Sequence, residues 1–166
     1  MSSRRRSREL ALQALFFMDV NHAYSQEMLD RFCANFTPAK KEAPFFFHLV
    51  EGVIRSVPDI DAIIVRFSSN WKIGRMSGTD RNIMRIAAFE MLFCNDIPAK
   101  VSINEAIDVG KKFGSEESGA FINGILDSIR LAFENGECDS IIADTGAGSR
   151  QSDRQPVQPD PEGGVT

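Results

Sequence analysis

The stretch of sequence that decides the fold runs from Asp80 to Leu126 and reads DRNIMRIAAFEMLFCNDIPAKVSINEAIDVGKKFGSEESGAFINGIL. Its first part, up to Phe93, has no glycine or proline and alternates charged with apolar residues at helical spacing, which predicts a helix. The Asn-Asp-Ile-Pro run that follows predicts a tight loop, because Asn and Asp favour turns and proline in a helix interior removes a hydrogen bond.

Two more helices are predicted in the rest of this stretch. Ser102 and Glu105 have the spacing of a capping box, in which the serine hydroxyl accepts from the backbone N–H of Glu105 and the carboxylate accepts from the N–H of Ser102. The helix that begins there is expected to end at Gly114, in a left-handed backbone conformation. Ser115 is then expected to cap the next helix, whose first turn holds two glutamates.

The middle of the chain also shows helical periodicity. Apolar residues recur at i, i+3, i+4, i+7, i+8 and i+11 from Phe46 to Val57, which predicts a helix that buries one face and ends before Pro58. Asp59 is expected to cap a further short helix that runs to about Phe67. Nothing in the sequence favours a strand.

These patterns predict an all-α fold, a compact helical bundle built from two packed groups of about three helices each. The N-terminal helices extend to about residue 67, residues 68–79 form a connector with polar residues and two glycines, and the C-terminal helices occupy 80–137. Residues 138–166 are expected to form a disordered acidic tail, because five acids, two arginines and few aliphatic residues cannot bury enough apolar surface to offset the ordering entropy.

Composition is typical of a small protein of the cell interior. The chain has 166 residues, 43% of them hydrophobic, which suffices for a core. No apolar run approaches the roughly 20 residues that span a bilayer, and we expect a cytoplasmic protein with no membrane contact. Three widely spaced cysteines without a C-x-x-C pair suggest neither a disulfide framework nor a zinc site. No metal or cofactor is expected.

The first helix carries the sharpest functional pattern. At 100° per residue, Phe16 falls about 20° from Arg5, away from the apolar side and near Gln13. Guanidinium groups that hold phosphates, an amide that reads a base edge and a ring that stacks on a base together suit single-stranded RNA. The alternatives are a second helix that covers Phe16 with Leu12, and a basic N-terminus that is merely solvated. The basic residues of this cluster are Arg4, Arg5, Arg6 and Arg8.

The segments DRNIMRIAAFEML, IPAKVSINEAIDVGKKFGSEESG and FINGILDSI, read in order, closely resemble the C-terminal half of the NusB family of bacterial transcription antitermination factors. The N-terminal RRRSRELALQALF resembles the basic first helix of that family, whereas residues 21–77 match only in helix pattern. The resemblance implies an RNA-binding adaptor that binds boxA-type single-stranded RNA of ribosomal RNA operon leaders with ribosomal protein S10 (NusE). Such an adaptor helps to assemble the antitermination complex on RNA polymerase.

The resemblance also assigns roles to individual residues. SEESGAFINGIL aligns with a GxEDSxKFVNGVL-like motif of the family, which implies RNA contacts by Ser118 and Phe121, with Glu117 at the position of the motif's aspartate. Ala120 stands where the family often has a lysine. From the pattern alone, Phe121 lies at the border of the apolar stripe, so core packing is the alternative role for its ring.

Charged residues on the helix from Asp80 form a mixed-charge series that, by default, faces water or makes structural pairs. The resemblance implies that Asp80, Arg85 and Glu90 lie at the S10 interface. Lys111 and Lys112 are most simply the solvated end of a helix, favourably placed against its negative dipole.

The sequence contains no motif that supports an enzymatic function. There is no G-x-S-x-G motif and no P-loop, and the two histidines lack metal-ligand spacing. The competing hypothesis is a protein-only helical module that self-associates through exposed apolar residues such as Leu12 and Phe16. NusB-like domains also precede RNA methyltransferase domains, but no such catalytic domain is evident here. The sequence is compatible with both a monomer and a homodimer that masks its RNA face.

Overall fold

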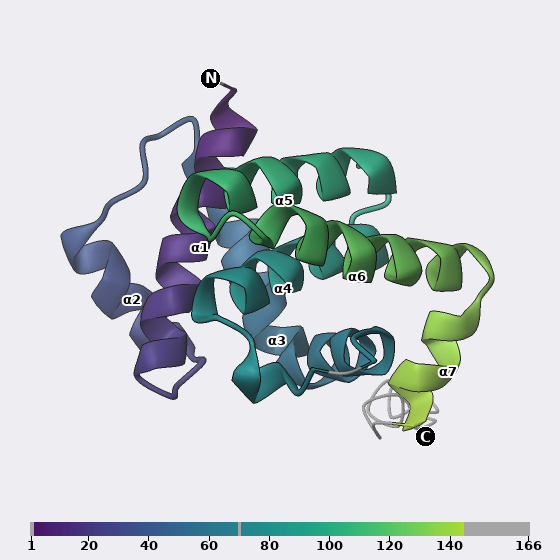
Figure 1. Cartoon of the computed structure of the whole chain (residues 1–166). Helices are drawn as coiled ribbons and strands as arrows, with labels where there is room; N and C mark the ends of the chain where they lie inside the picture. Colours follow the sequence, from purple (N-terminus) through teal and green to yellow (C-terminus); the bar gives the residue numbers. More distant parts are fainter. Residues whose placement is uncertain (1, 70, 145–166) are drawn as a thin grey trace, which may run out of the picture.

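The computed structural model describes residues 2–69 and 71–144, and this part of the chain is helical throughout (Figure 1), which confirms the predicted all-α class. The predicted tail beyond residue 144 lies outside the described residues. The elements are α1 (Ser3–Val20), α2 (Gln26–Asn35), α3 (Ala43–Phe67), the single 3-10 turn η1 (Ile73–Arg75), α4 (Gly78–Phe93), α5 (Ala99–Phe113), α6 (Ser118–Glu134) and α7 (Glu137–Asp144).

Helix α4 is the centre of the bundle. It packs against α1 and α3 of the N-terminal group and against α5 and α6 of its own group. In Figure 1, α5 and α6 lie side by side in front of it, while α2 and α7 lie at opposite ends of the molecule. The largest fully buried side chains come from five helices: Phe46, Leu15, Met18, Leu29, Leu49, Ile60, Ile63, Ile64, Met84, Ile122, Leu126 and Ile129, with α1, α2, α3, α4 and α6 all represented.

The prediction that a helix ends before Pro58 is wrong. α3 continues through Pro58 as one helix of 25 residues, so Asp59 does not cap a separate one. Its apolar stripe is buried on both sides of the proline, from Phe46 to Val53 and from Ile60 to Ile64. Burial of this long stripe offsets the roughly 3 kcal/mol that an interior proline costs.

Two predicted helix starts also differ from the structure. α4 begins at Gly78, because the Ser77 hydroxyl accepts from the backbone N–H of Asp80 at 3.0 Å. α5 begins at Ala99, directly after Pro98, so the predicted capping box at Ser102 does not form. Ser102 instead lies buried within the helix, where its hydroxyl contacts another element.

The end of α5 is close to its predicted position. Gly114 is the C-cap, but its φ of −96° is not left-handed. A side chain would not fit there, since a Cβ would lie 2.3 Å from the Ser118 hydroxyl oxygen. Ser115 does not cap α6, which begins at Ser118; the Ser118 hydroxyl instead accepts from the backbone N–H of Ser115 at 2.9 Å.

The predicted start of the tail at Cys138 is also wrong. Residues Glu137–Asp144 form α7, which packs on α3 and α6. The Cys138 side chain is buried against this bundle, so the helix holds the chain to the core up to at least residue 144. The sequence pattern did not predict this helix, because eight residues are too few to show a clear helical periodicity and the segment that follows is rich in Gly, Ser and Pro.

All three cysteines of the chain lie within the described residues. All three cysteines are free, and burial raises the pKa of Cys94 to about 11, which keeps this thiol protonated at neutral pH. No cluster of three or more potential metal ligands occurs between residues 2 and 144, position 70 aside. Over the same residues, no helix has the length and apolar character needed to cross a bilayer.

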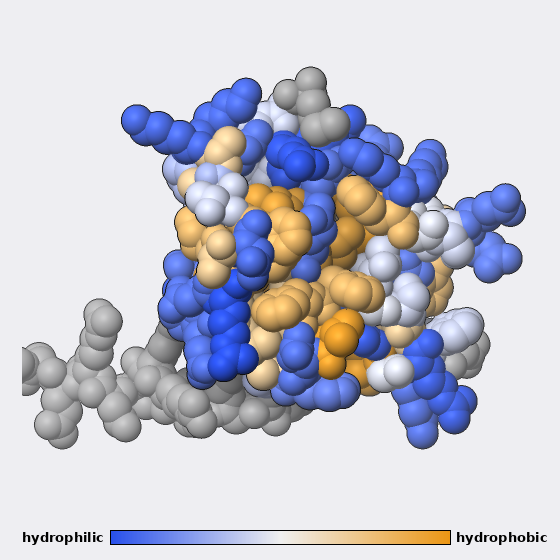
Figure 2. Space-filling model, turned by 90° about the vertical axis from the view of Figure 1, so that its left-hand side faces the viewer, coloured by the Kyte–Doolittle hydropathy of each residue, from blue (hydrophilic) through white to orange (hydrophobic). Residues whose placement is uncertain are grey.

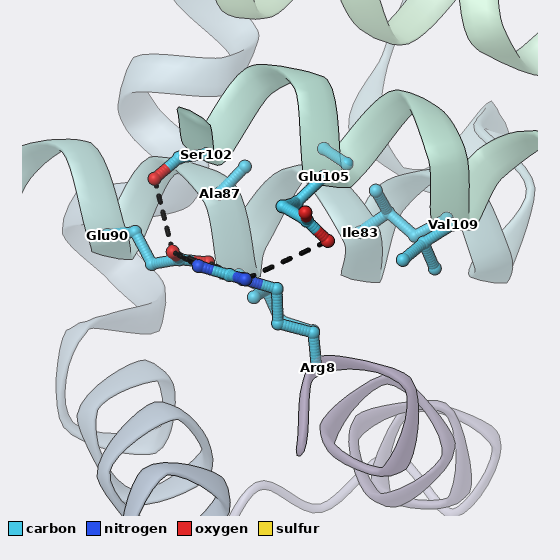
Figure 3. Close-up of a pocket in the computed structure, with 9 residues that line it drawn as sticks. Arg8, Ile83, Ala87, Glu90, Ser102, Glu105 and Val109 are labelled. Carbon is cyan, nitrogen blue, oxygen red and sulfur yellow. Dashed lines mark hydrogen bonds and ion pairs between the residues drawn. The ribbon is translucent and has the colours of Figure 1, made fainter. Parts of the chain in front are cut away.

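A buried ion pair joins α1 to the C-terminal helices (Figure 3). The Arg8 guanidinium donates to the Glu90 carboxylate, with Nη2 at 2.6 Å and Nε at 3.0 Å from its two oxygens, and both side chains are almost completely buried. The Ser102 hydroxyl donates to the same carboxylate at 3.1 Å, and Glu105 lies 3.8 Å from Arg8. The space left beside the pair has a volume of only about 10 Å³, so the pair is closely packed.

A second polar cluster ties the end of α1 to the start of α4. Arg81 donates to Asp19 and to the backbone carbonyl of Met76, and Arg85 donates to Tyr24 and, at 2.8 Å, to Asp61 of α3. Burial by itself raises the pKa of Asp19, but hydrogen bonds from Tyr24 and Arg81 outweigh it and lower that pKa below its ordinary value. Burial, together with the hydrogen bond to Asp19, raises the pKa of Tyr24 to about 12.

Helices α3 and α4 pack closely at Gly52. A Cβ placed on Gly52 would lie 2.1 Å from Cζ of Phe89, well inside van der Waals contact. Phe89 is itself buried, so its ring has little freedom to move aside. The absence of a side chain at Gly52 therefore allows α3 and the Phe89 ring of α4 to pack this closely.

Removal of Arg8 should destabilise the fold. We expect Arg8→Ala to lower the free energy of unfolding by about 3 to 5 kcal/mol, because Glu90 is left as a buried, uncompensated charge. The double variant Arg8→Met with Glu90→Leu should recover most of that loss. Arg31→Ala, which breaks an exposed pair with Glu27, is the control and should change stability by less than about 1 kcal/mol. Urea denaturation measures all three; equal midpoints would refute the structural role of Arg8.

A second stability prediction compares two helical glycines. Gly52→Ala should cost about 1 to 3 kcal/mol through overlap with Phe89. Gly124→Ala, in α6 with open space where the Cβ would lie, should instead stabilise the protein by about 0.5 to 1 kcal/mol. Thermal unfolding of both variants tests this, and a Gly52→Ala protein as stable as Gly124→Ala would contradict the close contact.

Candidate nucleic-acid interface

The arginine cluster lies in the first two turns of α1. The Ser2 hydroxyl caps this helix by accepting from the backbone N–H of Arg5 at 3.2 Å. Arg4 and Arg6 are about half exposed, Arg5 somewhat less, and Arg8 is buried. The prediction that Arg8 contacts RNA directly is therefore wrong, since its donors face Glu90 inside the bundle.

The side chains of Arg4 and Arg5 contact different neighbours. The Arg4 guanidinium lies over the Phe45 ring, 4.8 Å from its centroid, and 3.5 Å from Asp96. Arg5 makes a bidentate contact with Glu105 at 2.9 and 3.0 Å and reaches Asp108 at 2.9 Å. The hydrogen bond from Arg5 lowers the pKa of Glu105, and the same bond raises the pKa of Arg5. Acids of α5 thus hold Arg5 in place and offset part of its charge.

Glu9 links α1 to the end of α5. Its buried carboxylate accepts from Lys112 at 2.9 Å and from Arg6 at 3.3 Å. Lys112 is therefore not merely the solvated end of a helix, as its position in the sequence suggested. Two half-exposed cations, Arg6 and Lys112, are held next to one another around one acid.

Phe16 points outward, as its position on the helix predicted. It is 42% exposed, whereas Leu12 of the same broad face is buried, so one covering helix does not hide both. Gln13 is half-buried beside them. Figure 2 shows apolar side chains gathered among hydrophilic ones on the side of the molecule where α1 and α2 lie. The ring of Phe16 contacts the start of α4, since a Cβ on Gly78 would lie 3.0 Å from it.

The start of α6 holds the other predicted RNA residues. Glu117 is exposed at the N-cap position. Ser118 is buried, with its hydroxyl committed to the backbone of Ser115, so the predicted direct contact of this side chain with RNA is wrong and its role is to shape the turn. Phe121 is half-buried and packs edge-on against Trp71, with ring centroids 5.7 Å apart.

A surface hollow of about 240 Å³ lies between the start of α4 and the start of α6. It connects the two groups of predicted residues, because Ser77 in its wall precedes Gly78, against which Phe16 packs. The Oδ1 oxygen of Asp80 lies in this region without a hydrogen-bond partner among the described residues. The hollow is lined by Trp71, Arg75, Met76, Ser77, Asp80, Ser115, Glu117, Ser118 and Phe121.

The structure corrects the predicted S10 surface. Arg85 and Glu90 are buried and paired with Asp61 and Arg8, and Asp80 is nine-tenths buried. Their charge pattern resembled a water-facing series, but α4 is enclosed by four other helices. Arg85 and Glu90 therefore hold the bundle together and do not form a surface for a partner.

The sequence did not predict a role for two residues that line the hollow, Trp71 and Arg75. Trp71 and Arg75 lie in the segment that the sequence predicts only as a connector, because its glycines and serines indicate a break between helices. A lone tryptophan in a polar segment was the available signal, since large aromatic residues outside helices seldom lack a packing or binding role.

Comparison with known proteins identifies the family. Residues 5–130 match the NusB family. The chain is 60% identical over 131 residues to "Transcription antitermination protein NusB" of Desulfatibacillum aliphaticivorans, which covers 79% of this chain and 92% of that protein. It is 51% identical over 142 residues to the protein of the same name from Desulfosudis oleivorans, with 84% and 92% covered.

Solved structures agree with the sequence comparison. NusB of T. maritima superposes with a TM-score of 0.69 at 36% identity, covering 77% of this chain and 90% of that one. A NusB chain from a crystal structure of antitermination factors NusB and NusE in complex with double-stranded RNA gives a TM-score of 0.70 at 25% identity, with 80% and 98% covered. By family match, identity and fold together, this chain belongs to the NusB family.

Proposed function

We propose that the chain is an RNA-binding transcription antitermination factor. It binds boxA-type single-stranded RNA of ribosomal RNA operon leaders together with ribosomal protein S10 (NusE), and it helps to assemble the antitermination complex on RNA polymerase. Because transcription and ribosomal RNA synthesis take place in the bacterial cytoplasm, that is where it acts.

The observations that carry the proposal are the cations held at the start of α1 and the end of α5, and the exposed rings on α1 and next to the start of α6. Arg6 and Lys112 supply positive charge around Glu9, and Phe16 supplies an exposed ring further along α1. Phe121 lies across the hollow that begins beside Gly78. Cations that hold phosphates and rings that stack on unpaired bases are the elements of single-strand recognition.

The comparison with NusB and NusE bound to RNA supports the part of the proposal that concerns S10. A protein of this size offers a short RNA track, and a few phosphate and stacking contacts bind weakly alone. A second protein that docks beside the track brings its own contacts to the same RNA, so that each partner raises the effective concentration of the other. The buried Arg85 and Glu90 contribute by fixing α4 in the bundle.

The direct test is electrophoretic mobility of a boxA-like RNA with the full chain, with S10 and with both. The proposal predicts a weak shift with the chain alone and a stronger one with both proteins. Light scattering on the free protein runs in parallel. Self-association without any RNA shift would favour the competing protein-only module, for which exposed Phe16 and Val20 are the supporting observation.

Salt dependence tests the phosphate contacts. Arg6→Ala should weaken RNA binding and reduce the slope of log affinity against log salt by roughly 0.7, the value for one phosphate contact on a single strand. Arg31→Ala removes the same charge from exposed α2 and serves as the control. Filter binding over a range of salt concentrations gives both slopes, and identical slopes would remove Arg6 from the RNA site.

A further inference from the structure

Trp71 is the single tryptophan of the chain, and it lies in the connector between the two helix groups. Its side chain is 53% exposed, the largest exposed aromatic surface next to the hollow. A large exposed aromatic ring beside a hollow offers apolar contact area to a ligand. Neither the sequence pattern nor the resemblance to the family gave it a role.

The turn that carries Trp71 is fixed by hydrogen bonds. The backbone N–H of Trp71 donates to the carbonyl of Ser68 at 2.8 Å, and the buried Ser68 hydroxyl donates to the carbonyl of Trp71 at 3.0 Å. The same hydroxyl lies 3.2 Å from the carbonyl of Val65 at the end of α3. Trp71 is therefore held at a set place relative to α3, although it projects into solvent.

Trp71 and Phe121 together separate two surface hollows. Their rings meet edge to face at an interplanar angle of 70°. On one side lies the hollow of about 240 Å³ described above, and on the other lies a shallower one of about 280 Å³ next to Ala120 and Gly124. Both rings line both hollows, so each hollow offers an aromatic wall of the size of a planar base.

The other residues that line the 240 Å³ hollow suit a nucleobase better than an apolar side chain of a protein partner. Around the rings lie charged and hydroxyl side chains that can hydrogen-bond the edge of a base, among them Arg75, Ser77, Ser115 and Glu117. Buried centres of protein interfaces are depleted of charged residues, whereas extruded bases are stacked on rings and hydrogen-bonded along their edges.

The position of the hollow also matches an RNA path. Phe16 packs on Gly78, the neighbour of Ser77 in the wall, so an exposed ring of α1 leads to the Trp71 ring across the start of α4. Arg5 and Phe16 are 11 residues apart, or roughly 16 Å along the helix, which a few nucleotides span.

We propose that Trp71 is a base-stacking residue, which with Phe121 receives one unpaired nucleobase of the bound RNA in the hollow at the start of α4. This inference rests on the proposed function, since it extends the same RNA face to a residue beyond the arginine cluster and Phe16. Trp71 acts through its ring alone, so another aromatic residue should replace it.

The intrinsic fluorescence of the single tryptophan can report on RNA binding at Trp71. Titration of the full chain with a boxA-like RNA should quench the Trp71 fluorescence in step with the gel shift, because a stacked base lies against the indole. Trp71→Leu should weaken RNA binding by about tenfold, in the range found for loss of one stacked base. Trp71→Phe should retain most of the affinity. Phe133→Leu, a partly exposed ring near the opposite end of α6, should bind like the unaltered protein.

Several results would overturn the inference. RNA that binds without a change in fluorescence, or equal affinities for Trp71→Leu and the unaltered chain, would remove Trp71 from the RNA site. Quenching by S10 alone, with S10 binding rather than RNA binding weakened in Trp71→Leu, would assign the ring to the protein partner. Failure of the unaltered chain to shift RNA with or without S10 would instead refute the proposed function itself. Quenching of the unaltered protein tests the inference even if Trp71→Leu does not fold.

Discussion

The buried pair between Arg8 and Glu90 is the interaction on which the arrangement of the molecule depends. Two charges removed from water stabilise the fold only when their geometry and remaining hydrogen bonds are satisfied. Ser102 satisfies a further lone pair of Glu90, which brings α5 into the same contact. These contacts fix the distance of α1 from α4 and α5 and the rotation of α1 about its own axis. The exposed charges at the start of α1 follow from that rotation.

Helix composition and the class of the fold could be predicted from the sequence, because they depend on local periodicity. The apolar stripe that begins at Phe46 correctly predicted the first part of α3, although not its continuation through Pro58. The errors fell where tertiary packing overrides local signals. Pro58 is tolerated inside α3 because apolar residues on both sides of it are buried, and α7 forms because it has a surface to pack on.

The functional face could be predicted only in part, for a related reason. The outward direction of Phe16 follows from helix geometry and was predicted correctly. The roles of Arg8, Arg85 and Glu90 were not, since a charged residue on a helix is by default on the surface and only the neighbours of α4 show otherwise. Trp71 was not predicted because the hollow beside it is formed by two segments, residues 71–80 and 115–121, that are far apart in the chain.

The contact of Gly52 with Phe89 has a consequence for how this protein recognises anything. At this contact the buried Phe89 ring rests directly on the backbone of α3, which leaves little room for α3 and α4 to shift against one another here. A ligand that touches both halves therefore meets a surface already in its final shape. Little conformational entropy is then lost on association, and a weak ligand retains more of its interaction energy as affinity.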